Sequence, residues 1–450
     1  MVLPIVKYPN PILSTKCQEV KKFDKELAGL ISDMSETLRN YDGVGLAAPQ
    51  VGAAKKIILI SYDNKKNGPG KNTLVLVNPK IVWKSSERNK AIEGCLSFPG
   101  LELEVERANK IKLKAQNQKG EYIKVKAQDI LARIIQHEYD HSQGIVFTKR
   151  TKKLPAIAKG NIIFFTTDNF GLEILVGLVA AGYKISAIVT DCTKPSGRGR
   201  KISKSQAQLV AERLEIPLLE IEDVKDKNAE DKIRYYKPDL GIVASYGHIL
   251  PTNIFKIPKY GIINVHPSLL PKYRGASPIA SAIISGEKQT GVTLIKISEK
   301  VDQGGIIAQA IHNIDIDDTT EILQRKLTIL ANKLLIQTLP DFIDGKIKPQ
   351  KQKESEASST KKIKKEDGLI NWKKPTKYIE RQIRAYKPWP GTYTFLHGKR
   401  IIIHKAHLNK DGQLVLDIVQ PEGKKPMPAS AFAKGNKKLL TALPAFVIIK

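Results

Sequence analysis

The sequence has few cysteines, few aromatic residues and no long apolar run. Only three cysteines (Cys17, Cys95 and Cys192) occur among 450 residues, too few and too scattered for a disulfide framework. No apolar run approaches the roughly 18 residues that cross a bilayer. The start, MVLPIVKYPNPIL, lacks the charged and apolar segments of a secretion signal. We therefore expect a soluble, cytoplasmic protein without a membrane partner.

Acidic residues are scarce relative to basic ones. Lys and Arg number 74 against 45 Asp and Glu, a net charge of +29. Residues 351–450 alone contain 22 basic and 8 acidic side chains, so nearly half of that charge lies in the last hundred residues. A cationic surface attracts polyanions, and the charge predicts contact with nucleic acid. A solvated Lys-rich surface without a partner is the open alternative.

The first 150 residues predict an α+β domain. Short β-type runs occur at 55–62, 73–83, 101–107 and 110–116, separated by Gly, Pro and Asn. Helical stretches at 24–39 and 128–141 bracket them. A Lys-rich connector with Pro155 follows, so we place a linker at 151–159.

The rest of the chain predicts two further domains. From residue 160, continuous apolar strands alternate with helices, which is typical of a doubly wound, Rossmann-like parallel sheet over 160–344. The polar stretch 345–367 indicates a linker or an extended crossover. Alternating segments from 368 to 450 predict a small, OB-like β-barrel, a common nucleic-acid scaffold.

A candidate metal site lies at QHEYDH, residues 136–141. His137 and His141 are four apart, so a helix would present both imidazoles on one face, with Glu138 beside them to handle a proton. A third ligand is required, and Cys95 in EGCLSFPG is the best candidate. One Cys and two His suit zinc or ferrous iron.

Three motifs together resemble the bacterial peptide deformylases: Gly43–Gln50 (GVGLAAPQ), Glu93–Ser97 (EGCLS) and Gln136–His141 (QHEYDH). The resemblance implies that Cys95, His137 and His141 hold Fe²⁺, with Zn²⁺, Ni²⁺ or Co²⁺ able to substitute. It implies that Glu138 is the general base and acid, and that Gln50 and the backbone N–H of Leu96 form the oxyanion hole. The implied substrates are nascent formyl-Met peptides at the ribosome.

A second constellation carries no metal-ligand spacing. Asn264 and His266 are two apart at the end of an apolar strand, so they share one face at the edge where parallel sheets bind ligands. Asp302, in the loop VDQGG, is placed to pair with the imidazole and to raise its pKa.

Residues 160–450 resemble the methionyl-tRNA formyltransferases, through NVHPSLLPKYRGASPI (264–279), GVTLIKISEKVDQGG (291–305), PSGRGRK (195–201), IRAYKPWPGTY (383–393) and QPEGKKPM (420–427). The resemblance implies catalysis by Asn264, His266 and Asp302. It implies a 10-formyltetrahydrofolate site lined by Ser268, Leu269, Leu270 and Pro271, and initiator Met-tRNA as acceptor. In the loop PSGRGRK, Arg198, Arg200 and Lys201 are suited to contact tRNA phosphates.

These inferences predict a bifunctional enzyme of translation initiation. One half would add a formyl group to Met-tRNA and the other would remove it from the nascent peptide. Two alternatives stay open: one half is catalytically silent and serves as a tRNA- or ribosome-binding module, or the formyltransferase uses an acceptor other than tRNA.

Overall fold

The computed structural model describes residues 1–41, 43–63, 68–150, 160–192, 204–436 and 441–449. The chain forms two compact units. The first comprises Met1–Gly160, Leu172–Ile188 and Thr193–Leu218, and the second comprises Asn161–Gly171, Val189–Cys192 and Leu219–Lys450. None of the described helices is long and apolar enough to span a membrane.

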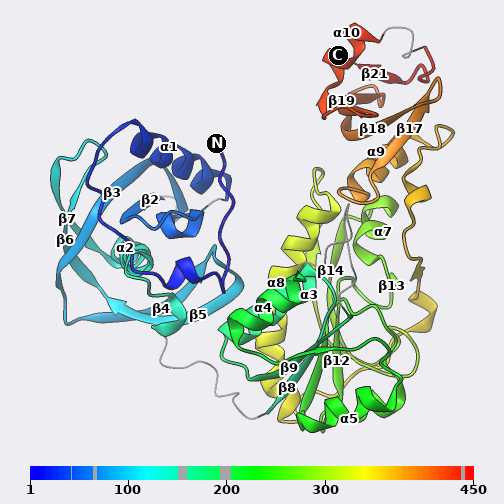
Figure 1. Ribbon diagram of the computed structural model, residues 1–450, viewed down its shortest axis with the longest axis horizontal. Coiled ribbons are helices and arrows are strands. Elements are labelled where there is room, and N and C mark those ends of the chain that lie inside the picture. Colours follow the sequence, from blue (N-terminus) through cyan, green and yellow to red (C-terminus); the bar gives the residue numbers. More distant parts are fainter. Residues whose placement is uncertain (42, 64–67, 151–159, 193–203, 437–440, 450) are drawn as a thin grey trace. The chain divides into compact units, whose positions relative to one another are not determined.

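The first 150 residues wrap two sheets around a central helix (Figure 1). Helix α1 (Lys25–Asn40) begins at Asp24, whose carboxylate accepts the N–H of Leu27. The larger sheet has the order β1-β2-β3-β6-β7. Its strands are β1 (Gly45–Ala47), β2 (Ile57–Asp63), β3 (Gly68–Lys84), β6 (Lys110–Gln116) and β7 (Tyr122–Gln128). Strands β4 (Arg88–Cys95) and β5 (Phe98–Ala108) form a separate antiparallel pair.

Helix α2 (Asp129–Ser142) is the central helix, and it is buried over most of its length. Ala132 and Ile135 pack against the apolar faces of β2, β3 and β6, including Ile58 and Ile111. This apolar contact anchors the first two turns, so the last two turns, which carry polar residues, are held inside the domain. The α+β prediction for this region is confirmed.

The following region is built on a seven-stranded sheet with the order β10-β9-β8-β11-β12-β14-β15. The strands are β8 (Ile162–Phe165), β9 (Ile185–Thr190), β10 (Leu218–Glu220), β11 (Leu240–Val243), β12 (Ile262–His266), β14 (Gln289–Lys296) and β15 (Ile306–Asn313). Strands β8, β11 and β12 are parallel, as predicted. Strands β14 and β15 are antiparallel to their neighbours, so the sheet is mixed rather than purely parallel.

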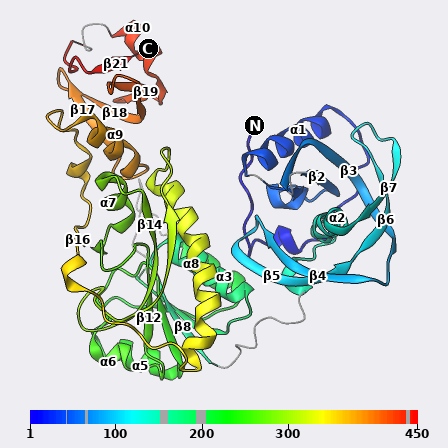
Figure 2. The ribbon, with the colours of Figure 1, turned by 180° about the vertical axis from the view of Figure 1, so that it is seen from behind.

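Helices cover this sheet. They are α3 (Asn169–Ala180), α4 (Gln206–Leu214), α5 (Lys227–Tyr235), α6 (Thr252–Phe255), α7 (Pro278–Ser285) and α8 (Thr320–Ile343). Figure 2 shows α8 running along one face of the sheet, where it packs against β14 and β15. Strand β8 is buried at every residue, which explains its continuous apolar sequence, IIFF.

The polar segment 345–367 contacts this region through its backbone and side chains. Its strand β16 (Ser359–Thr360) pairs in parallel with β13 (Arg274–Gly275). Gln352 is almost fully buried, and its amide donates to the carbonyls of Asp302 and Gly304 at 2.8 Å each. The segment therefore contacts this region through backbone pairing and a buried side chain, and its assignment as a linker or an extended crossover stays a prediction.

The C-terminal region is a five-stranded sheet with two helices. The order is β17-β18-β19-β20, and β21 pairs with β19. The elements are α9 (Thr376–Ala385), β17 (Thr392–Leu396), β18 (Lys399–Leu408), β19 (Leu414–Pro421), β20 (Met427–Pro428), α10 (Ala429–Gly435) and β21 (Val447–Ile449). Ile379 of α9 and Phe432 of α10 pack against Ile403 and Leu414 in one apolar core.

Candidate functional site

Three elements bring the residues of the first constellation together. Helix α2 carries His137, Glu138 and His141, strand β4 ends at Cys95, and the 3₁₀ helix η2 (Ala48–Val51) carries Gln50. Cys95 Sγ lies 3.3 Å from His141 Nε2, and the amide of Gln50 donates to the same sulfur at 3.5 Å. Gln50 is itself held by its Oε1, which accepts the N–H of Ala47 at 2.8 Å.

Leu96, the residue expected to offer its backbone N–H, follows Cys95 directly, and its side chain packs on the apolar cluster of α1 and β2. That side chain fixes the start of the turn after β4. The backbone N–H of Leu96 therefore lies next to Cys95, because it belongs to the peptide group that joins the two residues.

The donor atoms fit a metal ion. One atom each from Cys95, His137 and His141 lie within 4.8 Å of one another. His137 Nδ1 is 2.9 Å from Glu93 Oε2, so Nε2 is the ring nitrogen that can bind a metal ion. One sulfur and two imidazole nitrogens in a tight cluster are a ligand set for zinc or ferrous iron, with room for a fourth ligand.

Glu138 is buried beside these donors. Its Oε2 atom has no hydrogen-bond partner among the described residues. Burial raises the pKa of the carboxyl to about 7, although nearby His137 and Arg107 act to lower it. A carboxyl with that pKa can accept and return a proton near neutral pH.

Gly45 makes room for Glu138. A Cβ on Gly45 would lie 2.8 Å from Glu138 Cγ and 2.9 Å from Cδ, and would contact Oε1 still more closely. The backbone at Gly45 is not left-handed. The close approach of Glu138 therefore explains why a glycine stands here.

An ion-pair network that the sequence reasoning missed holds His137 in place. Arg107 donates to both oxygens of Glu93, at 2.7 and 2.9 Å, and to Asp140 Oδ2 at 2.7 Å. Arg133 also donates to Glu93, at 2.5 Å. Burial would raise the pKa of Glu93, but the hydrogen bonds from Arg107 and His137 outweigh it and lower the pKa to about 2. An ionised Glu93 fixes the proton on His137 Nδ1 and orients the ring.

The second constellation also converges. Asn264 and His266 lie on β12, and Asp302 lies in the loop between β14 and β15. Asp302 Oδ1 accepts the amide of Asn264 at 3.0 Å, and Oδ2 accepts the N–H of Gly275 at 2.7 Å. His266 Nδ1 is 3.6 Å from Oδ2, while its Nε2 donates to the carbonyl of Tyr273 at 2.9 Å. The carboxylate thus joins the two strand residues.

The loop expected to line the donor site, Ser268–Pro271, follows β12 and is held from β14 and β15. The hydroxyl of Thr293 donates to the carbonyl of Ser268 at 2.6 Å and accepts the N–H of Leu270 at 3.1 Å. The amide of Gln309 donates to the carbonyl of Leu270 at 2.8 Å. The sequence did not assign this role to either residue: Thr293 stands in the motif at 291–305 without a stated function, and Gln309 stands outside the motifs.

Buried Arg274 connects the segment 345–367 to this site. It donates to Gln352 Oε1 and, through two nitrogens, to the carboxylate of Glu354. Since Gln352 donates to the carbonyl of Asp302, the segment 345–367 helps to hold the loop that carries Asp302.

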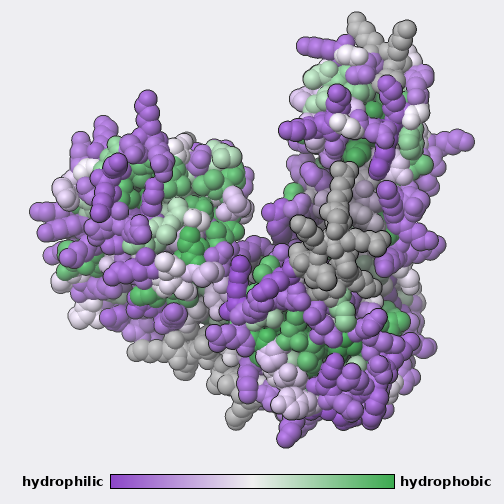
Figure 3. Space-filling view, in the orientation of Figure 1, coloured by the Kyte–Doolittle hydropathy of each residue, from purple (hydrophilic) through white to green (hydrophobic). Residues whose placement is uncertain are grey.

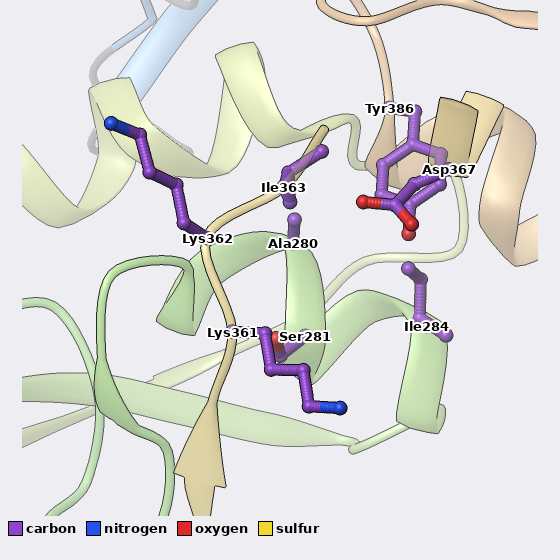
Figure 4. Close-up of a pocket in the computed structure, with 8 residues that line it drawn as sticks. All are labelled: Ala280, Ser281, Ile284, Lys361, Lys362, Ile363, Asp367 and Tyr386. Atoms are coloured by element: carbon purple, nitrogen blue, oxygen red, sulfur yellow. The ribbon is translucent and has the colours of Figure 1, made fainter. Parts of the chain in front are cut away.

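A cavity of about 220 Å³ lies elsewhere in this unit, between α7, residues 361–363 and Tyr386 (Figure 4). None of the candidate catalytic residues lines it. The three basic residues predicted to contact tRNA, Arg198, Arg200 and Lys201, lie outside the described residues.

Family models match the chain in three places. "Polypeptide deformylase" matches residues 2–156, "Formyl transferase" matches 161–339, and "Formyl transferase, C-terminal domain" matches 362–411. Among solved structures, peptide deformylase 1B of Arabidopsis thaliana is 39% identical, covering 34% of this chain and 82% of that one, with a TM-score of 0.32. The peptide deformylase of Thermotoga maritima is 37% identical, covering 34% and 99%, with the same TM-score of 0.32.

Curated relatives match the larger part of the chain. The methionyl-tRNA formyltransferase of Thermodesulfovibrio yellowstonii is 38% identical over 296 residues, which are 61% of this chain and 96% of that protein. That of Bacillus licheniformis is 37% identical over 298 residues, covering 61% and 94%. Both resemblances seen in the sequence are confirmed. The chain belongs to the methionyl-tRNA formyltransferase family and carries, ahead of that part, a peptide deformylase domain.

Proposed function

We propose that the chain catalyses two opposed reactions of translation initiation. It transfers the formyl group of 10-formyltetrahydrofolate to the amino group of initiator Met-tRNA, and it hydrolyses the formyl group from formyl-Met at the start of nascent peptides. The observation that carries the proposal is that both sets of chemical groups converge: three metal donors beside a buried carboxyl, and an Asn–Asp–His cluster at a strand end.

In the deformylase half, Cys95, His137 and His141 would hold ferrous iron, or zinc, nickel or cobalt in its place. When bound, such an ion polarises the formyl carbonyl and makes water more acidic. Glu138 takes the proton of the water that adds to the formyl carbon. Gln50 and the N–H of Leu96 donate to the developing oxyanion. As the carbon–nitrogen bond breaks and formate leaves, Glu138 returns the proton to the amine.

In the formyltransferase half, the methionyl amine attacks the formyl carbon. Asn264 gives one amide N–H to Asp302 and keeps the second for the oxyanion. Asp302 orients Asn264 through this hydrogen bond, and its second oxygen faces His266 Nδ1 at 3.6 Å. The new carbon–nitrogen bond forms while the bond to folate N10 breaks, and the proton lost by the amine ends on N10. Ser268–Pro271 would line the folate site.

The basic C-terminal region, with Arg198, Arg200 and Lys201, would engage the tRNA through its phosphates. We place the enzyme in the cytoplasm, and the deformylase half near the ribosome, because both substrates arise in translation there. The deformylase activity need not destroy the product of the formyltransferase. It would require a peptide after formyl-Met and would therefore leave formyl-Met-tRNA intact.

The test uses the intact chain and two single variants. We expect Glu138→Gln to lose release of formate from a formyl-Met peptide and to keep synthesis of formyl-Met-tRNA. His266→Ala should show the reverse pattern. A wild-type chain that lacks one activity would show that half to be a silent binding module. Transfer to no tRNA would favour another formyl acceptor, and rapid hydrolysis of formyl-Met-tRNA would contradict its sparing.

A further inference from the structure

The outward face of β6 and β7 carries five lysines, which we call the lysine face: Lys110, Lys112, Lys114, Lys124 and Lys126. They alternate along both strands with residues such as Ile111 and Leu113 that turn into the core. Strict alternation places all five on one side of the sheet, and all five are exposed. Figure 3 shows hydrophilic side chains projecting where Figure 1 labels β6 and β7.

Like charges stand directly opposite one another on this face. Lys112 is paired in register with Lys126, and Lys114 with Lys124 on one side and with Lys80 of β3 on the other. Side chains opposite each other in antiparallel strands are close neighbours, so these pairs destabilise the sheet. The arrangement costs folding stability, and a bound polyanion would offset that cost.

No ion pair joins the lysine face to a carboxylate within the described part of the chain. Most acidic residues of this domain's strands lie in the other sheet, Glu93 in β4 and Glu102, Glu104 and Glu106 in β5, while Asp63 is the last residue of β2. Glu121, which precedes β7, accepts the amide of Asn117 at 2.7 Å. Positive charge is therefore concentrated on one surface of the domain and not neutralised there.

Exposed aromatic rings flank the lysines. Trp83 of β3 is 45% exposed and lies opposite Lys112, whose Nζ is 4.9 Å from the ring centroid. Tyr122, at the start of β7, is 86% exposed. Phosphate-binding lysines beside open aromatic rings are the combination by which sheet surfaces hold single-stranded nucleic acid: lysines follow the backbone and rings stack on bases.

We propose that the lysine face, with Trp83 and Tyr122, binds single-stranded or looped RNA. This surface lies on the deformylase domain, and the proposal does not depend on either catalytic assignment. RNA fits better than a membrane, because the aliphatic residues of β6 are buried and its exposed side chains are lysines.

The test compares two intact-chain variants that lose the same charge. One replaces Lys112, Lys114, Lys124 and Lys126 by Gln. The matched control replaces four exposed lysines elsewhere on the domain by Gln: Lys16, Lys21, Lys22 and Lys25. The probe is an oligouridine RNA of about 12 nucleotides, a typical site size for such surfaces. Binding is measured from 50 to 200 mM salt.

Each phosphate contact adds about −0.7 to the slope of log affinity against log salt for a single strand. Loss of four contacts therefore flattens the slope by about 2.8, so a fourfold rise in salt weakens the wild type roughly fiftyfold more than the variant. The control should keep the wild-type slope. The lysine-face variant should melt at or above the wild-type temperature, since opposed charges are removed.

A second measurement locates the RNA. With a 4-thiouridine probe, photo-crosslinks should fall on peptides that contain Trp83 or Tyr122, and the lysine-face variant should lose them. Equal changes of slope in both variants, or crosslinks confined to the formyltransferase half, would overturn the proposal and leave an ordinary solvated surface.

Discussion

Gly45→Ala is the sharpest perturbation of the deformylase site that the structure offers. The added methyl group points at Glu138, with Cγ at 2.8 Å and Cδ at 2.9 Å. Ordinary contact begins at 3.4 Å, so Cγ must move by at least about 0.6 Å. Glu138 is buried, and the shift would therefore carry its carboxyl away from the reacting atoms.

The expected loss follows from that displacement. A misplacement near 1 Å costs about 100-fold in rate, and a general base contributes about 10²- to 10⁴-fold. We expect the kcat/KM for formate release from a formyl-Met peptide to fall about 100-fold, which is about 2.7 kcal/mol of transition-state stabilisation. Overpacking should also lower the free energy of unfolding of this domain by about 1–3 kcal/mol.

The assay measures formate release and formyl-Met-tRNA synthesis by the same intact chain, together with the metal content per chain. Metal content and transfer activity should stay at wild-type values, since the three atoms nearest the new methyl group all belong to Glu138. The matched control is Gly29→Ala in α1, where an added Cβ meets no atom within 4 Å. It should keep full activity and gain about 0.5–1 kcal/mol of stability. Deformylation by Gly45→Ala at the wild-type rate would refute the role given to Glu138.

Three further predictions concern residues behind the two sites. Glu93→Gln removes the charge that pairs with Arg107 and orients His137, so metal affinity in a chelator competition should drop about 10- to 100-fold, and unchanged affinity would argue against that role. Thr293→Val deletes the hydroxyl that joins two backbone groups of the loop 268–271, so KM for the formyl donor should rise more than kcat falls. The free energy of unfolding should fall by about 1–3 kcal/mol. A fall of kcat with KM unchanged would contradict this role. Asp302→Ala should lower formyl transfer about 100-fold and leave deformylation intact, and an equal loss of both would point to misfolding instead.

Local spacing made much of both sites predictable. His137 and His141 are one turn apart, and Asn264 and His266 are two apart on a strand, so periodicity alone places each pair on one face. The third member of each site, Cys95 or Asp302, was proposed from the chemistry that each site requires, and the motif resemblance then implied the same residue. The structure places Cys95 beside His141 and places Asp302 within hydrogen-bonding distance of Asn264.

The supporting residues were not predictable from one sequence. Arg107 and Arg133 stand in strand and helix patterns where a charged residue ordinarily faces water, and only the register of β5 and the packing of α2 bury them against Glu93. Gln352 lies in a Lys-rich stretch whose composition resembles a solvated linker. Burial of such groups depends on partners 14 to 50 residues away, which no local period records.

The two sites are positioned by different kinds of interaction, and this decides how each responds to damage. The ligands of the deformylase site are held by ion pairs between almost fully buried side chains. Removing one partner leaves the other charge buried and unpaired, which lowers the free energy of unfolding by about 3–5 kcal/mol. The loop 268–271 of the formyltransferase site is held by neutral hydrogen bonds from Thr293 and Gln309 to its backbone. Loss of one of these bonds therefore costs about 1–3 kcal/mol of unfolding free energy. Substitutions behind the metal site should therefore act first on folding and metal retention, and those behind Asn264 and His266 on substrate positioning.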